Sequence, residues 1–268
     1  HHLLRHVDDY SILSSLWRHA AEYHANDDKY MLCLQREIEI LLHMVQFYSS
    51  KRNSNTDHSP KRKLALAYRN LALLSSDKGL MHQALDLLSV IATATNDPPD
   101  IELAATTAHA LYTMTNNTEY LLQAANTYIV LASHIHDNQS FDGVVALEQK
   151  LKYLLLAIEY FDHIYASTES VEYCIIISDA FYSLSQLDIG DADKIEFVTQ
   201  AIEYYEKFIS QHMTRARMCQ LAKYYEQRAA LTQSAPDYFT AAKYLEQYSV
   251  SDIDLYHSAA CYDFSGQL

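Results

Sequence analysis

Pairs of amphipathic helical segments recur along this chain at an interval of about 40 residues. The clearest pair lies in residues 64–97, where one apolar stripe ends at Asp77-Lys78-Gly79 and a second ends at Asn96-Asp97-Pro98-Pro99. In both stripes the apolar side chains return every three or four residues, which is the spacing of one helix face. Gly79 is expected at the turn because glycine is favoured just after a helix C-terminus. One such pair cannot cover its own apolar face, so the pairs must stack on one another.

A small residue at one position of the second helix marks each repeat. These residues lie 33 to 44 positions apart and are Ala84, Ala124, Ala157, Ala201 and Ala242. Residues 8–50 hold two further long helical patterns, at about 11–24 and 30–48. The unit over residues 141–164 is the least regular, because its two apolar stretches are separated by little turn signal.

The composition supports long helices. Only four Gly and four Pro occur in 268 residues, which leaves few turns and disfavours a β-rich fold. A hydrophobic content of 49% argues against wholesale disorder. No apolar run approaches the roughly 18 residues that a membrane span needs, and no signal-peptide pattern opens the chain, so we expect a cytoplasmic protein without an integral membrane span. We predict an all-α solenoid of five to six antiparallel helix pairs, forming a single domain over residues 8–268.

The order of residue types within a pair resembles a tetratricopeptide repeat. An aromatic, a leucine and a small residue in the first helix precede a turn glycine and a second-helix alanine, here Tyr68, Leu71, Ala72, Gly79 and Ala84. A strict tetratricopeptide array repeats every 34 residues. The longer interval in this chain is also similar to the tetratricopeptide-like SNAP vesicle-fusion adaptors. The resemblance implies a right-handed solenoid that binds a protein or peptide on its concave face.

The resemblance also implies which side chains face the ligand groove, since the first helix of each pair lines it in tetratricopeptide proteins. Carried over to this sequence, these are Arg69, Leu73, Asp77, His109, Thr113, Asn116, Tyr182, Gln186, Lys223 and Glu226. The family's clamp for a chaperone C-terminus needs Lys and Asn at two positions that are Arg69 and Leu73 here, and His109 and Thr113 in the next repeat. This chain does not reproduce that clamp.

We therefore expect a non-enzymatic scaffold or adaptor. Two alternatives are a peptide-sensing regulatory domain that controls a partner, and a SNAP-like trafficking adaptor. The formal net charge of −14 argues against nucleic acid as the partner and favours a protein or peptide with basic groups. Self-association also remains open.

Residues 51–63, KRNSNTDHSPKRK, form the one clear shift in composition. This basic stretch has no periodicity, and we expect a flexible loop. Its two basic clusters resemble a bipartite nuclear-import signal, and Ser59-Pro60-Lys61-Arg62 resembles a proline-directed phosphorylation site. A solvated loop between helices is the simpler interpretation of both.

No sequence pattern indicates a cofactor or a catalytic site. The four glycines are too far apart for a phosphate-binding loop, and no CxxC pair occurs. His134 and His136 are two residues apart, so on a helix their rings point in opposite directions, and no metal site is expected. The scattered cysteines Cys33, Cys174, Cys219 and Cys261 are expected to be reduced and to serve in packing.

Two features leave alternatives open. The chain has 22 tyrosines, and the doublets Tyr204-Tyr205 and Tyr224-Tyr225 must place one ring of each off the apolar stripe. Such rings either line a ligand groove or pack between neighbouring helices. The segment 255–266 looks like a first helix with no second helix after it. It is either a capping helix or part of a longer array.

Overall fold

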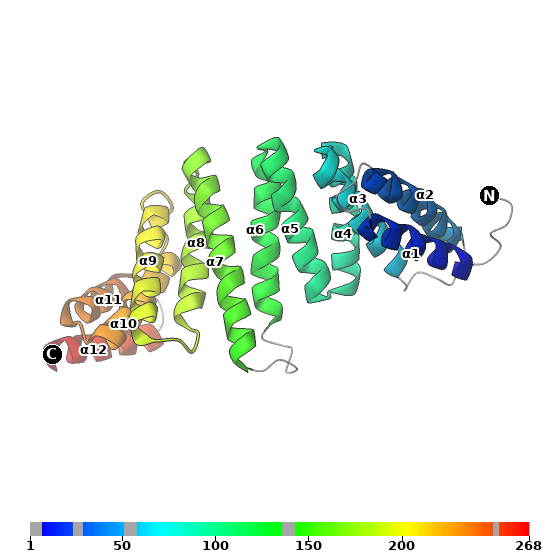
Figure 1. Cartoon of the computed structure of the whole chain (residues 1–268). Coiled ribbons are helices and arrows are strands. Elements are labelled where there is room, and N and C mark those ends of the chain that lie inside the picture. The colour runs from blue at the N-terminus through cyan, green and yellow to red at the C-terminus, as the bar shows by residue number, and fades with distance from the viewer. Residues whose placement is uncertain (1–6, 24–28, 51–57, 136–142, 249–251, 268) are drawn as a thin grey trace. The chain divides into compact units, whose positions relative to one another are not determined.

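The computed structural model describes residues 7–23, 29–50, 58–135, 143–248 and 252–267. These ranges form twelve helices and contain no strand (Figure 1). The helices are α1 (Val7–Tyr23), α2 (Lys29–Ser50), α3 (Ser59–Ser75), α4 (Lys78–Thr95), α5 (Pro98–Thr115), α6 (Thr118–His134), α7 (Gly143–Thr168), α8 (Glu172–Ser185), α9 (Asp191–Ile209), α10 (Arg215–Thr232), α11 (Ala235–Tyr248) and α12 (Asp252–Gln267). In these ranges no helix combines the length and apolar character that a membrane span requires.

The helices group into two compact units, His1–Thr127 and Tyr128–Leu268, with the division inside α6. In the first unit, each of the helices α1 to α4 packs on the next helix in the chain. In the second, each of the helices α7 to α11 does the same. The predicted all-α solenoid is thus confirmed. The prediction of a single domain is not tested by this division, because each element of a repeat array contacts only its neighbours.

Two-residue links set the length of the repeat. The first residue of each link has a left-handed backbone conformation, and its N–H group donates a hydrogen bond to a carbonyl in the last turn of the preceding helix. These residues are Ser76 (φ 54°), Asn96 (φ 52°), Asn116 (φ 57°) and Gln233 (φ 53°). The first three lie twenty residues apart, because each of the two helices between them has 18 residues. Two helices and two links therefore make about 40 residues, which explains why the interval exceeds the tetratricopeptide period of 34.

Gly79 does not end a helix, contrary to the expectation from the sequence. The left-handed residue at the end of α3 is Ser76, whereas Gly79 lies in the first turn of α4. Asp77 caps α4, and its carboxylate accepts the N–H groups of Gly79 at 2.8 Å and Leu80 at 3.2 Å. A Cβ atom at Gly79 would lie 3.2 Å from the Asp77 Oδ1 atom, so the glycine leaves room for this cap.

The repeat alanines lie in the buried core of the helix array. All five, Ala84, Ala124, Ala157, Ala201 and Ala242, are completely buried. At two of them a buried serine from the neighbouring helix donates a hydrogen bond to the alanine carbonyl. The Oγ–O distances are 2.6 Å for Ser178 and Ala201, and 2.9 Å for Ser258 and Ala242. A larger side chain than alanine would separate these backbones.

The basic stretch is only partly a loop. Residues 51–57 lie outside the described ranges, but α3 already begins at Ser59, so the loop predicted through Lys63 is wrong for residues 59–63. Pro60 is favourable in a first helical turn, where its missing N–H has no helical partner to lose. Arg62 then pairs with the buried Asp100 of α5, which orders this end of the helix.

The unit predicted over residues 141–164 contains one long helix rather than two. Helix α7 runs without a break from Gly143 to Thr168, and Phe141 lies outside the described residues. Residues 143–150 have no glycine or proline after Gly143 and no other helix-breaking residue, so the helix continues. Likewise, α12 continues through Gly266 to Gln267.

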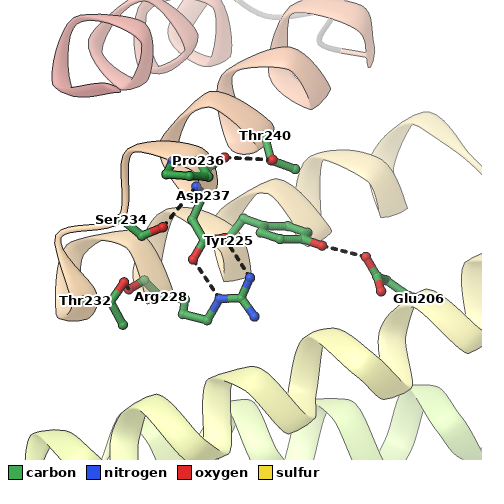
Figure 2. A network of polar contacts seen from close by, with 8 residues as sticks. All are labelled: Glu206, Tyr225, Arg228, Thr232, Ser234, Pro236, Asp237 and Thr240. Atoms are coloured by element: carbon green, nitrogen blue, oxygen red, sulfur yellow. Dashed lines mark hydrogen bonds and ion pairs between the residues drawn. The ribbon is translucent and has the colours of Figure 1, made fainter. Parts of the chain in front are cut away.

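Charged pairs and tyrosine hydroxyls join neighbouring helices in the second unit (Figure 2). The guanidinium of Arg228 in α10 donates two hydrogen bonds, at 2.8 and 2.7 Å, to the carboxylate of Asp237 in α11. It also lies 5.1 Å from the ring centre of Tyr225. The hydroxyl of Tyr225 donates to Glu206 in α9 at 2.6 Å. Three consecutive helices are therefore connected through one cluster.

Candidate functional site

The groove-facing residues expected from the family resemblance divide between the two units. In the first unit, Arg69 and Leu73 lie on α3, Asp77 caps α4, His109 and Thr113 lie on α5, and Asn116 ends α5. In the second unit, Tyr182 lies on α8, Gln186 follows its last turn, and Lys223 and Glu226 lie on α10. Each set is therefore considered within its own unit.

Several expected residues of the first unit serve the helix ends. Asp77 is the N-cap of α4, and Asn116 is the left-handed residue after α5. The hydroxyl of Thr113 donates to the carbonyl of Ala110 at 2.7 Å. Leu73, by contrast, has an exposed fraction of 50%, and the half-buried Arg69 has an Nε atom without a hydrogen-bond partner in the described part of the chain.

In the second unit, Tyr182 takes part in helix packing. Its ring stacks on that of Tyr224 in α10, with the ring centres 4.3 Å apart. Glu226 lies 3.8 Å from the ring nitrogen of His257 in α12. Lys223 is exposed. These contacts do not test the expected role in ligand binding.

A groove elsewhere in the second unit is lined by three consecutive helices, and we call it the α6–α8 groove. Its volume is about 350 Å³, within the range of ligand-binding clefts. Its apolar wall consists of Ile129, Ala132, Leu154, Ile176 and Ala180. Its polar groups are Ser133, Lys150, Asp179 and Ser183. The helices α6, α7 and α8 follow one another in the chain, and each contributes side chains to the groove.

The carboxylate of Asp179 is the most distinctive group in the α6–α8 groove. Its Oδ1 atom accepts the hydroxyl of the fully buried Tyr224 at 2.9 Å. The surrounding protein raises the pKa of Asp179 by removing part of the water around its carboxylate, although the hydrogen bond from Tyr224 acts in the opposite direction. In the described part of the chain, Asp179 forms no ion pair with a cationic residue. Its charge is therefore not part of an ion pair with the described residues.

The remaining polar groups complete a mixed rim. Lys150 on α7 offers an ammonium group and forms no ion pair within the described ranges. Ser183 lies on the same side of α8 as Asp179, one helical turn further, and its hydroxyl donates to the Asp179 carbonyl at 2.7 Å. The groove thus presents an anion, a cation and hydroxyls beside an apolar wall. Such a surface can hold an apolar group and orient a charged one next to it.

The tyrosine doublets serve packing between helices. Three of their hydroxyls, and also that of Tyr262, donate to a carboxylate of another helix. The pairs are Tyr204 with Asp162 (2.6 Å), Tyr224 with Asp179 (2.9 Å), Tyr225 with Glu206 (2.6 Å) and Tyr262 with Glu246 (2.7 Å). The buried rings of Tyr205 and Tyr224 meet edge to face at 5.3 Å. Of the two alternatives for the doublets, packing between neighbouring helices is confirmed.

Potential metal ligands do not cluster among the described residues, and most of the thiols are buried. No group of three or more His, Cys, Asp or Glu side chains gathers there in a way that could hold a metal ion. His134 is the last residue of α6, and His136 lies outside the described ranges, so their pairing is not tested. The four cysteines are free, and all but Cys219 are buried.

The residues lining the α6–α8 groove could not be identified directly from the sequence. Their helices were expected, but the packing of α6, α7 and α8 around one groove has no signature in the local pattern. One signal was present in α8, whose sequence EYCIIISDAFYSLS places one acidic residue, Asp179, in the middle of an apolar helix. An ionisable residue in such a setting is a candidate for a functional position.

No protein-family model matches this sequence, and no curated protein matches it. Among solved structures, the S. pombe nuclear import adaptor Nro1 is similar at 12% identity with a TM-score of 0.38, covering 97% of this chain and 94% of that one. BtubC from P. vanneervenii is similar at 14% identity with a TM-score of 0.33, covering 97% and 88%.

A structure described as the human IFIT1 dimer with PPP-AAAA is similar at 14% identity with a TM-score of 0.27. It covers 94% of this chain and 70% of that one. At such low identities and TM-scores, none of these similarities supports a functional conclusion for this chain.

Proposed function

We propose that this chain is a non-enzymatic scaffold that binds a protein or peptide, and that the α6–α8 groove is a principal contact. The observation that carries the proposal is the groove itself, which combines an apolar wall with a mixed polar rim. The tetratricopeptide-like order of residues supports the same class of function. The residues expected from the family resemblance to face a groove remain part of this proposal as a further contact surface within each unit.

The charge of the second unit supports a protein partner with basic groups. Residues 128–268 contain nine Lys and Arg against twenty Asp and Glu, a formal net charge of −11 out of the −14 of the whole chain. An acidic surface repels the phosphate backbone of nucleic acids and attracts cationic segments over a distance of about one Debye length.

A blocking variant tests the proposal. Ser183→Trp fills the rim of the α6–α8 groove from an exposed position, so it changes the groove without disturbing a buried side chain. Ser210→Trp is the matched control, because Ser210 is also exposed, also donates to a helix carbonyl, and does not line the groove. Immobilised wild-type protein and both variants are used to capture partners from a cell extract.

We expect the wild type and Ser210→Trp to retain the same proteins and Ser183→Trp to lose them. Retention of an identical set by Ser183→Trp would show that the groove is not the contact surface. If Arg69→Glu or Lys223→Glu removes the same proteins instead, the surface suggested by the family resemblance is the correct one.

A further inference from the structure

We propose that the α6–α8 groove recognises an apolar side chain followed or preceded by a cationic one, with Asp179 as the counter-ion of that cation. This inference rests on the proposed function and names the chemistry of the partner. The occupant is a segment of another polypeptide that carries leucine or a similar residue beside arginine or lysine.

The wall of the α6–α8 groove offers apolar surface to an aliphatic side chain of the partner. Ile129 and Ile176 come from different helices and are only half-buried, so each keeps apolar surface that solvent reaches. Leu154 and Ala180 are buried and complete the wall. Covering exposed apolar surface of this kind is favourable because it releases ordered water. An aliphatic side chain that enters the groove removes this surface from water.

Asp179 offers a carboxylate to the cationic side chain of the partner. The Tyr224 hydroxyl is a neutral donor, and no described cationic residue pairs with this carboxylate. Asp179 is an exposed residue, so the ammonium or guanidinium of a bound segment can reach its carboxylate. Arginine suits the position because its planar guanidinium can donate two hydrogen bonds to one carboxylate.

The distribution of charge favours the same partner. The second unit carries a net charge of −11 by formal count, so a basic segment is attracted before it makes contact. Lys150 lies on the same groove and can donate to a carbonyl of the bound segment, since its ammonium forms no ion pair in the described ranges. A segment with an acidic residue next to its apolar one would meet Asp179 with like charge.

The test uses two acetylated and amidated peptides, Gly-Ser-Leu-Arg-Leu-Ser-Gly and the same sequence with Gln in place of Arg. Each carries a fluorescent label, and binding is measured by anisotropy up to about 1 mM protein, which detects weak affinities. The protein variant is Asp179→Asn, which removes the charge and keeps an oxygen that can accept the Tyr224 hydroxyl. Asp162→Asn is the matched control, because Asp162 also accepts a tyrosine hydroxyl but does not line the groove.

In wild-type protein we expect the Arg peptide to bind about 5 to 10 times more tightly than the Gln peptide, the range of a partly exposed charged hydrogen bond. Asp179→Asn should bring this ratio close to one, whereas Asp162→Asn should leave it unchanged. An unchanged ratio in Asp179→Asn, equal binding of both peptides to the wild type, or no binding of either peptide overturns the inference. The capture experiment with Ser183→Trp is independent of these peptides, so the scaffold function can stand when this inference fails.

Discussion

Removal of Arg62 should destabilise the first unit more than removal of Asp100, although the two side chains form one ion pair. The side chain of Asp100 has an exposed fraction of 3%, and that of Arg62 has 37%. In Arg62→Ala the buried carboxylate keeps one described side-chain donor, the Thr95 hydroxyl at 3.0 Å. A buried charge left without its partner costs about 3–5 kcal/mol. In Asp100→Ala water can solvate the remaining guanidinium, so we expect a loss of about 1–2 kcal/mol.

The pH dependence gives this prediction a second, independent measurement. Burial by itself raises the pKa of Asp100, but the hydrogen bonds from Arg62 and Thr95 outweigh burial and hold it below the usual value. The wild-type carboxylate therefore contributes stability above the unfolded pKa of about 3.9, and this contribution is lost as the pH falls through the lower folded pKa. Without Arg62, burial dominates and the folded pKa rises above about 3.9. The penalty in Arg62→Ala is then present at neutral pH and disappears as the carboxylate takes up a proton.

Urea unfolding followed by far-UV circular dichroism measures both effects. The free energy of unfolding lost in Arg62→Ala should be larger at about pH 7 than at about pH 4.5. Arg36→Ala is a control, because Arg36 pairs with Glu39 on the surface of α2, with both side chains more than half exposed, and should cost less than about 1 kcal/mol. Equal losses for Arg62→Ala and Asp100→Ala, or a loss in Arg62→Ala that is independent of pH, would refute the reasoning.

Three further outcomes follow from the second unit. Ala201→Leu places a large side chain where α8 and α9 are joined by the Ser178 hydrogen bond, and should lower the free energy of unfolding by about 1–3 kcal/mol. Ala166→Leu is the neutral control, because Ala166 is exposed on the surface of α7. The tyrosines of the doublets should ionise well above pH 10 in a spectrophotometric titration, because burial and neighbouring carboxylates raise their pKa values. The stability that their protonated hydroxyls contribute is present below pH 10 and is lost as the pH rises through the folded pKa values. A single transition near pH 10 in folded protein would contradict this prediction. Burial raises the pKa of Cys261 to about 11, so this thiol should resist a thiol reagent at about pH 8 until the protein unfolds. Rapid labelling of Cys261 in folded protein, identified by peptide mapping, would show that the packing of α12 on α11 does not bury this thiol.

The helical architecture was predictable because it depends on local spacing. Apolar residues three and four positions apart and alanines at a regular interval require helices that pack closely in succession. The five repeat alanines are therefore all buried. Even the long repeat of about 40 residues follows from helix length and two-residue links, both of which are local properties.

The sequence-based predictions were wrong where two local signals competed. Gly79 looked like the end of a helix, but Ser76 tolerates the left-handed conformation and Asp77 uses the space that Gly79 leaves. Residues 59–63 looked like a loop because they are basic, yet the buried partner of Arg62 lies 38 positions further along the chain. A distant contact of this kind has no signature in the local pattern.

The sequence alone determined that this chain forms stacked helices, that its small residues mark where the helices meet, and that its surface is acidic. Only the tertiary structure decided that α7 is a single helix, that the tyrosine doublets bind carboxylates on other helices, and that Asp179 lies in a groove with Lys150. The reason is physical: periodicity sets the conformation and the buried face of each helix, whereas a groove depends on how three helices pack together, and the residues that line it are far apart in the chain.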